Sequence, residues 1–306
     1  MTAQSSADNM VQPPCKVCGS ANIDFVGVKV GEWIRKEFTL FHCGDCGFAF
    51  IGNPCTNYEE IYDARYYRGE GADPKVDYLF ELNHPNRTIR RYEWEGIAKA
   101  IRSIRRSLGL DFSKETNWLD FGCGSGSMVR WLREQDISKA VGFEEGAISR
   151  LALERGTPIL NREDLLKCEA SFDIVTAIEV MEHVEHPLET LRLIRFCMKP
   201  NAIFFFTTGN AEKFGKDLIN WSYIKPEIHI SFYEPRTMEY ALSVTGFEPV
   251  KLNSKGGFSE IITFKILKNL GVRSLSLWQR MVPWPLIAPL ADRRYGVTAF
   301  PVGRAI

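Results

Sequence analysis

The stretch from Trp118 to Gly126 constrains the fold of this chain most, because a short apolar run there ends in a glycine-rich turn. The spacing is Asp-x-Gly-x-Gly-x-Gly, with Asp120 ahead of Gly122, Gly124 and Gly126. Glycine allows positive φ and a close approach of the backbone to a ligand. The stretch therefore predicts a buried strand, then a turn that holds a nucleotide-like cofactor, then a helix.

The turn differs from two other glycine-rich motifs. A dinucleotide-binding fingerprint needs a third glycine where this chain has Ser127, and a P-loop needs a Gly-Lys-Ser/Thr sequence that does not follow here. The next predicted strand ends at Glu144, roughly 20 residues after the glycines, where an acid can bind two ribose hydroxyls. We therefore expect Glu144 to contact the ribose of the cofactor.

This part of the chain resembles the class I S-adenosylmethionine-dependent methyltransferases. The resemblance covers about 116–208 and includes, beyond the glycine turn, the segments 172–184 and 198–206. It implies S-adenosylmethionine as the cofactor. The residues that it assigns to cofactor binding are Asp120, Gly122, Cys123, Gly124, Gly126, Glu144 and Glu179. The alternatives are a turn for another nucleotide and a merely structural turn.

Strand and helix patterns alternate through the same region, which predicts an α/β fold with a parallel sheet. We expect a Rossmann-like methyltransferase sheet of seven mostly parallel strands in a domain over 111–306. The sixth strand is expected at 247–252. The seventh is either 261–267 or, as the resemblance favours, 298–306 after a helical insertion at about 258–295. The other expected strands are 117–121, 139–144, 157–160, 172–178 and 202–208, and the expected helices are 126–135, 146–155 and 187–198.

Four of the eight cysteines form two Cys-x-x-Cys pairs, each followed by glycine, with 24 residues between the pairs. Two such knuckles complete a closed tetrahedral zinc site, which leaves no position for an activated water. The pattern predicts a structural zinc ribbon over 1–56, with four unligated thiols as the alternative. The predicted ligands are Cys15, Cys18, Cys43 and Cys46.

A connecting or lid segment is expected over 57–110. The methyltransferase resemblance makes Tyr66 and Tyr67 candidates to contact the methionine end of the cofactor, and packing is the alternative role for each. From 86 to 108 the apolar residues recur at helical spacing. The basic residues of that helix form either a phosphate-binding face or a solvated one.

The acceptor of a methyl group needs alignment with the cofactor and, for a hydroxyl or a carbon acid, a base. Histidine suits that role near neutral pH. His183 follows the fourth predicted strand, and His229 lies in a loop expected to border the same cleft. We predict that one of them deprotonates the acceptor with support from Glu182. The alternative for His183 is that it only holds its loop.

Composition indicates a cytoplasmic protein with reduced thiols. Basic and acidic residues both number 38, so no overall field attracts nucleic acid. The first fourteen residues contain no apolar segment typical of a secretory signal. The segment 268–306 is aromatic and carries a net charge of +5, from six basic residues and one acid, which suits a lid, a dimer contact or a membrane contact.

A ribbon, a tyrosine-rich segment and a methyltransferase core together resemble the sugar C-methyltransferases of deoxysugar pathways. Those proteins continue into a further domain that helps to bind a nucleotide-sugar, whereas this chain ends soon after its core. The expected acceptor is a small molecule such as a sugar, nucleotide-sugar or glycan precursor, methylated at carbon or oxygen. The alternatives are an RNA methyltransferase that grips the backbone through its ribbon and arginine-rich helix, and a non-catalytic ribbon protein that binds a partner.

Overall fold

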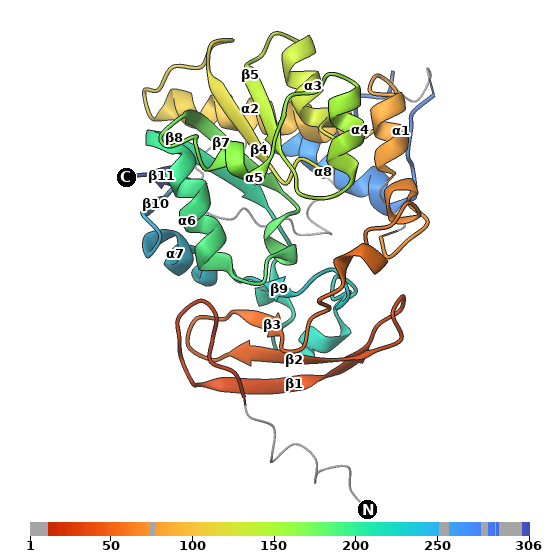
Figure 1. The fold of residues 1–306 in the computed structure, drawn as a ribbon, viewed down its shortest axis with the longest axis vertical. Helices are drawn as coiled ribbons and strands as arrows, with labels where there is room; N and C mark the ends of the chain where they lie inside the picture. The colour runs from red at the N-terminus through yellow and green to blue at the C-terminus, as the bar shows by residue number, and fades with distance from the viewer. Residues whose placement is uncertain (1–11, 74–76, 251–256, 277–280, 285, 288–301) are drawn as a thin grey trace, which may run out of the picture.

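A computed structural model describes residues 12–73, 77–250, 257–276, 281–284, 286–287 and 302–306. The larger of two sheets has the strand order β10-β11-β8-β7-β4-β5-β6 (Figure 1). All pairs from β8 to β6 are parallel, and β11 runs antiparallel to both β8 and β10. Its strands are β4 (Asn117–Phe121), β5 (Lys139–Phe143), β6 (Ile159–Leu160), β7 (Phe172–Ile178), β8 (Met198–Thr207), β10 (Phe247–Val250) and β11 (Val302–Ala305).

This sheet confirms the predicted α/β fold with seven mostly parallel strands. The seventh strand, β11, falls within the 298–306 alternative, and the 261–267 alternative is wrong because those residues belong to a helix. Asn201, near the start of β8, has φ 63°, a left-handed conformation that asparagine tolerates. The part of the predicted insertion at 277–280, 285 and 288–295, with Trp278 and Leu290, lies outside the described residues.

Helices cover both faces of the large sheet. Apolar residues of α2, α3 and α8 pack with Trp118 and Ile203 in one buried cluster, and those of α6 and α7 pack with Val175 and Phe204 in another. The helices are α1 (Tyr78–Asn83), α2 (Arg90–Ser107), α3 (Ser127–Glu134), α4 (Ile148–Glu154), α5 (Arg162–Leu165), α6 (Pro187–Cys197), α7 (Pro235–Ser243) and α8 (Phe258–Asn269).

The smaller sheet is antiparallel and has the order β1-β2-β3-β9. Three of its strands come from the N-terminal segment, and the fourth comes from the loop that precedes α7. Figure 1 shows this sheet beneath the large one, with β9 at the edge that is nearer to the large sheet. The strands are β1 (Ile23–Val30), β2 (Glu37–Cys43), β3 (Ala49–Ile51) and β9 (Ser231–Phe232).

The two cysteine knuckles meet at one end of this sheet. The Sγ atoms of Cys15 and Cys46 are 3.5 Å apart, as are those of Cys18 and Cys43, and all four lie within 4.8 Å of one another. A tetrahedral zinc ion with Zn–S bonds of about 2.3 Å places its sulfurs about 3.8 Å apart. The hydrogen bond between Cys46 and Cys15 lowers the pKa of the Cys15 thiol and raises that of the Cys46 thiol, so the two sulfurs share one proton while no cation is bound. The four side chains therefore fit a structural zinc ion.

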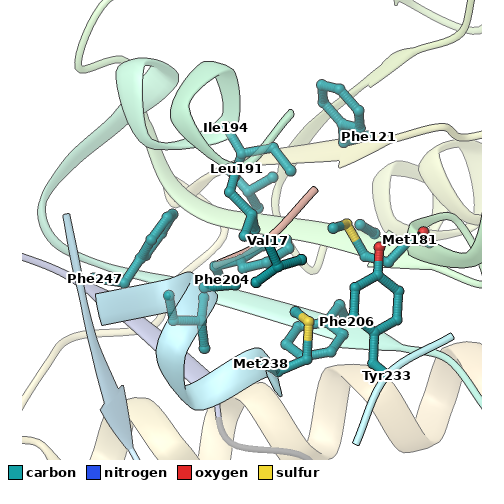
Figure 2. Packing of buried hydrophobic residues seen from close by; sticks show 14 of the residues in the cluster. Val17, Phe121, Met181, Leu191, Ile194, Phe204, Phe206, Tyr233, Met238 and Phe247 are labelled. Carbon is teal, nitrogen blue, oxygen red and sulfur yellow. Dashed lines mark hydrogen bonds between the residues drawn. The ribbon is translucent and has the colours of Figure 1, made fainter. Parts of the chain in front are cut away.

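The core of the small sheet is continuous with the core of the large one. Val17, between the first two cysteines, packs in the same buried cluster as Leu191, Met181 and Tyr233 (Figure 2). The Tyr233 hydroxyl donates to the Met181 carbonyl at 2.9 Å. The ribbon is thus packed directly onto the segment that follows β7.

The arginine-rich helix α2 does not present all of its cations on one face. Arg90 lies between Glu81 and Glu93, and these three side chains are buried or nearly so. Arg105 is buried too, and it donates to the carbonyls of Asp111 and Asp173. Within the described segments, no helix has the length and apolar character needed to cross a membrane.

Candidate functional site

The predicted glycine turn follows β4 and leads into α3. Gly122, Gly124 and Gly126 have φ values of 72°, 54° and 67°, a region that strongly favours glycine. A Cβ on Gly122 would lie 2.6 Å from Val180, and the Cys123 sulfur packs against Gly142. The turn therefore needs glycine both for its conformation and for the close approach of its neighbours.

Glu144 lies directly beside this turn. Its two carboxylate oxygens accept hydrogen bonds from the Gly124 N–H at 2.9 Å and the Gly146 N–H at 2.7 Å. Burial raises the pKa of Glu144, although these two bonds oppose that shift. A carboxylate has about four acceptor positions, so this one can accept further bonds from a pair of ribose hydroxyls. The turn and Glu144 thus fit the ribose end of S-adenosylmethionine.

The tyrosines of the connecting segment close around the same place. A Cβ on Gly146 would lie 3.0 Å from the Tyr67 hydroxyl, which puts Tyr67 beside Glu144. Burial and the Glu144 charge raise the pKa of Tyr67 to about 12. Tyr66 is stacked with Tyr78, whose ring lies against Gly124. The predicted cofactor contacts of Tyr66 and Tyr67 stay predictions, with both side chains near the turn.

Asp120, the residue before the last one of β4, has its side chain inside the protein. Its Oδ1 accepts the Thr176 hydroxyl at 2.8 Å, and burial raises its pKa to about 7. The same Thr176 oxygen accepts the Trp118 indole N–H at 3.0 Å. Asp120 therefore braces β4 against β7 at the base of the turn.

A cavity of about 450 Å³ opens at the carboxyl ends of β7 and β8, next to the turn. Helix α8 and the loop 221–229 form other parts of its wall, and Tyr66 and Tyr78 line it on the side of the glycines. Tyr78 thus lies between the turn and the cavity. This is the edge of a parallel sheet at which ligands bind.

Glu179 lies at the end of β7 and lines the cavity. Its φ of 54° is unusual for a residue other than glycine, and its carboxylate contacts Lys265 at 3.3 Å and Thr207 at 3.0 Å. Burial opposes ionisation, but the charges of Lys265 and Lys268 hold the pKa of Glu179 well below its usual range. Glu179 is therefore an anion at neutral pH, and its predicted contact with the cofactor stays a prediction.

Glu182 is fully buried in the same wall. Its Oε1 accepts the Tyr223 hydroxyl, while its Oε2 has no hydrogen-bond partner among the described residues. Burial and the negative charge of Glu179 raise the pKa of Glu182 to about 8. At neutral pH this side chain is largely the neutral acid, with one oxygen left for a ligand.

The structure brings the two predicted histidines together, with ring centroids 5.0 Å apart. Their Nδ1 atoms lie 2.7 Å from the Ile228 carbonyl for His183 and 2.6 Å from the Tyr223 carbonyl for His229. A carbonyl only accepts, so each neutral ring carries its hydrogen on Nδ1 and its basic lone pair on Nε2. Burial lowers the pKa of both rings, that of His229 to about 3.

These histidines and Glu182 also form a candidate cation site. One ligand atom from each of the three lies within 4.8 Å of the other two. Two imidazole nitrogens and a carboxylate oxygen are ligands that divalent transition metals accept. The cluster can therefore act on a bound hydroxyl directly or through a cation.

Other residues of the cavity carry no signal in a single sequence. Thr208 Oγ1 and Asn210 Nδ2 line it, are buried, and have no hydrogen-bond partner among the residues that the structure describes. Tyr223 and Lys265 reach Glu182 and Glu179 from segments 41 and 86 residues further along the chain. No local spacing motif connects such positions, so only the fold reveals them.

Known proteins are similar to parts of this chain. The ubiquinone biosynthesis O-methyltransferase of Sodalis glossinidius is 29% identical over 161 residues, which are 47% of this chain and 62% of that protein. That of Vibrio parahaemolyticus is 32% identical over 161 residues, 47% of this chain and 66% of that protein. The chain thus spans less than two thirds of these relatives.

Among solved structures, a Thermotoga maritima S-adenosylmethionine-dependent methyltransferase, described as a possible histamine N-methyltransferase, has 17% identity and a TM-score of 0.40, and the match covers 56% of this chain and 75% of that one. A family described as "Methyltransferase domain" matches residues 90–252. Because this match spans more than half of the 306 residues, the chain belongs to the methyltransferase-domain family.

Proposed function

We propose that this chain transfers a methyl group from S-adenosylmethionine to a hydroxyl group of a small acceptor in the cavity beside the glycine turn. The observation that carries the proposal is the position of Tyr78 between the glycine turn and the cavity. Its ring lies on Gly124 of the turn and also lines the cavity. A cofactor held by the turn and Glu144 would therefore have its methyl end directed toward the cavity.

The cavity offers contacts for a polar acceptor. Glu182 Oε2, Thr208 Oγ1 and Asn210 Nδ2 are buried polar atoms, and none has a hydrogen-bond partner within the described part of the chain. Buried polar groups in native proteins are nearly always paired, so such a set suits a ligand with several hydroxyl or carbonyl oxygens. A sugar, a nucleotide-sugar or a phenol that carries further hydroxyl or carbonyl groups meets that requirement.

Methyl transfer to a hydroxyl needs alignment and removal of its proton. The bound cofactor supplies a methyl group on a positively charged sulfur. The chain supplies Nε2 of His183 or His229 to accept the proton, with each ring held in one tautomer by its carbonyl contact. Glu182 lies beside both rings, and its carboxylate form, which appears as the pH rises toward 8, stabilises the imidazolium that forms.

The names of the curated relatives favour oxygen as the acceptor atom, because those proteins are O-methyltransferases. The acceptor itself is a separate proposal. The sugar, nucleotide-sugar or glycan precursor expected from the sequence remains our first choice, and a phenol is the second. Methylation at carbon is the alternative within the sugar class.

The test is a transfer assay with methyl-labelled S-adenosylmethionine and a panel of nucleotide-sugars, free sugars and phenols. We expect one class to take up label at oxygen. The His183→Gln/His229→Gln double variant should lose about 100-fold or more in turnover while it still binds S-adenosylhomocysteine. Full turnover by that variant would contradict the assignment of the base.

A further inference from the structure

The loop 223–232, here called the histidine loop, carries His229 and touches the segment that carries His183. The Ile228 carbonyl accepts from His183 Nδ1 at 2.7 Å, and the Ile230 N–H donates to the Glu182 carbonyl at 2.8 Å. The Tyr223 carbonyl of the same loop holds Nδ1 of His229 at 2.6 Å. The carbonyls that orient both histidines therefore belong to this one loop.

The other side of the histidine loop contacts the small sheet, whose strands β1, β2 and β3 belong to the predicted ribbon. β9 pairs with β3, and the Ile51 N–H donates to the Ile230 carbonyl at 2.9 Å. Lys29, on β1, donates to the carbonyls of Ile219 and Trp221 at 3.2 and 3.3 Å. The ribbon thus contacts the loop at β9 and also holds the chain that leads into it.

Glu227 makes the third connection. Its side chain is buried, at 3% exposed, and Oε1 accepts the Trp33 N–H at 2.7 Å and the Ile34 N–H at 3.4 Å. These amides lie in the turn between β1 and β2. Gly31 in that turn allows the approach, since a Cβ there would lie 2.4 Å from Oε1 of Glu227. The turn is therefore shaped to receive this carboxylate.

We propose that the ribbon is a positioning element for the two histidines and that Glu227 is its main positioning residue. The proposal rests on the proposed function in giving the histidines a role in methyl transfer. Short 3₁₀ segments and turns occupy the chain from 211 to 230, so little regular hydrogen bonding fixes the histidine loop from within. The ribbon supplies that support from outside, through Glu227 and β9.

A small displacement of the loop is enough to matter. Misplacement of a catalytic group by about 1 Å can lower a rate by about 100-fold. Loss of the Glu227 contacts frees one side of the loop while the glycine turn and Glu144 keep their own hydrogen bonds. The effect is therefore expected in kcat and in the environment of the imidazole rings, with cofactor affinity unchanged.

The experiment compares Glu227→Ala and Gly31→Ala with the matched control Glu32→Ala. Glu32 is an exposed residue of the same turn, so the control removes a carboxylate from that place without touching the loop. Gly31→Ala leaves Glu227 intact but obstructs the approach of its carboxylate to the turn. This second variant tests the proposal if Glu227→Ala does not fold. Glu227→Gln keeps one acceptor oxygen and should retain most of the wild-type behaviour.

Three quantities are measured on zinc-loaded, folded protein: kcat and KM, the dissociation constant of S-adenosylhomocysteine, and the NMR signals of the five histidine rings. We expect kcat to fall about tenfold or more in Glu227→Ala and Gly31→Ala. The ring signals of His183 and His229 should shift, and those of His84 and His186 should not. Glu32→Ala should match wild type in all three.

A purely structural role would lower the melting temperature of Glu227→Ala but leave kcat and both ring signals at their wild-type values, and that result overturns the proposal. Failure of the proposed function gives a different result. In that case no acceptor is methylated by wild type, while the ring signals of His183 and His229 still report whether Glu227 sets their positions. Unshifted rings in both variants would then reject the positioning role by themselves.

Discussion

At the scale of single residues, the site combines an unusual backbone conformation with acidic side chains that are largely withdrawn from solvent. Glu179 has a left-handed backbone and a half-buried carboxylate, and the Lys265 ammonium at 3.3 Å stabilises it. Such strain and such burial concentrate at functional sites because the surrounding structure holds them in place. The chemistry of the cavity follows from these individual environments.

The first prediction at this scale concerns Glu144. In Glu144→Ala we expect the affinity for S-adenosylhomocysteine to fall about 100-fold, because two hydrogen bonds to a charged group together contribute about 3 kcal/mol. Calorimetric titration measures it. Glu145→Ala is the matched control, since Glu145 is the adjacent exposed acid. An unchanged affinity in folded Glu144→Ala would remove Glu144 from the cofactor site.

The second prediction concerns pH. The pKa of Glu182 is raised to about 8, so its carboxylate form, which supports proton transfer, appears as the pH rises through that value. His229, with its pKa lowered to about 3, stays neutral over the same range. We therefore expect kcat/KM to increase between pH 7 and 9 with an apparent pKa near 8.

The variant Glu182→Gln tests the origin of that increase. It should lower kcat/KM by about 10- to 100-fold at pH 9 and abolish the rise. A rise that persists unchanged in Glu182→Gln would assign the ionisation to the acceptor or to another group. A rise centred near 6.5 instead would indicate a histidine with an ordinary pKa.

At the scale of elements, two contacts between segments far apart in the chain organise the site. The ribbon packs onto the segment after β7, and helices α1, α2 and α8 form the opposite wall. Within that wall, Arg90 of α2 contacts Glu81 of α1 and lies 4.9 Å from the Phe264 ring of α8. Each contact joins elements whose relative positions do not follow from their secondary-structure propensities.

For the ribbon, we predict that each wild-type chain binds one zinc ion. The Cys43→Ser variant should not bind it. The melting temperature should fall by about 10 °C, which corresponds to roughly 3–5 kcal/mol for a chain of this size. Elemental analysis and calorimetry measure the two effects. Cys168→Ser, at a half-buried cysteine outside the cluster, should keep its zinc. Wild-type protein without zinc would contradict the assignment.

For the helical wall, Arg90→Met leaves Glu81 and Glu93 buried beside each other without their cation. Removal of one partner from a buried ion pair usually costs about 3–5 kcal/mol of unfolding free energy. Urea denaturation should show a loss of that size. Arg130→Met, which breaks the exposed pair with Glu134, should cost less than about 1 kcal/mol. Equal losses of unfolding free energy in the two variants would mean that Arg90 does not stabilise the buried glutamates Glu81 and Glu93.

At the scale of the whole molecule, the charge balance bears on whether the acceptor is a small molecule or a nucleic acid. Basic and acidic residues balance at 38 each, and two arginines of the predicted phosphate-binding helix, Arg90 and Arg105, face inward. Proteins that bind nucleic acid through phosphates usually carry a basic footprint. Arg87, Lys99, Arg102 and Arg106 stay exposed, so the balanced overall charge is what makes the RNA methyltransferase the less favoured proposal.

We accordingly predict no retardation of a labelled RNA in a gel at about 10 µM protein and 0.15 M salt, a concentration within the range where non-specific binders act. A retarded band that weakens steeply with added salt would reverse this and restore the RNA methyltransferase alternative. Methyl transfer to RNA in the labelled assay would identify it directly.

The sequence by itself determined the features whose signal is local. Short sequence spacings define the glycine turn, Glu144, the alternating strands and the two cysteine pairs. The strands and helices of 117–178 and the cysteine cluster can therefore be located from the sequence alone. The same holds for His183, which lies in the short segment after the predicted strand 172–178. Local backbone geometry and the periodicity of apolar side chains depend only on residues that are close together in the sequence.

Only the tertiary structure decided which distant residues meet. It placed the ring centroids of His229 and His183 5.0 Å apart and added β9 to the sheet of β1, β2 and β3. It also brought Tyr223 to Glu182 and Lys265 to Glu179. It also turned 261–267 into a helix, because that apolar run packs against α2 and its cluster instead of the sheet edge. Burial, and the pKa shifts that follow from it, depend on the complete packing, which no short stretch of sequence contains.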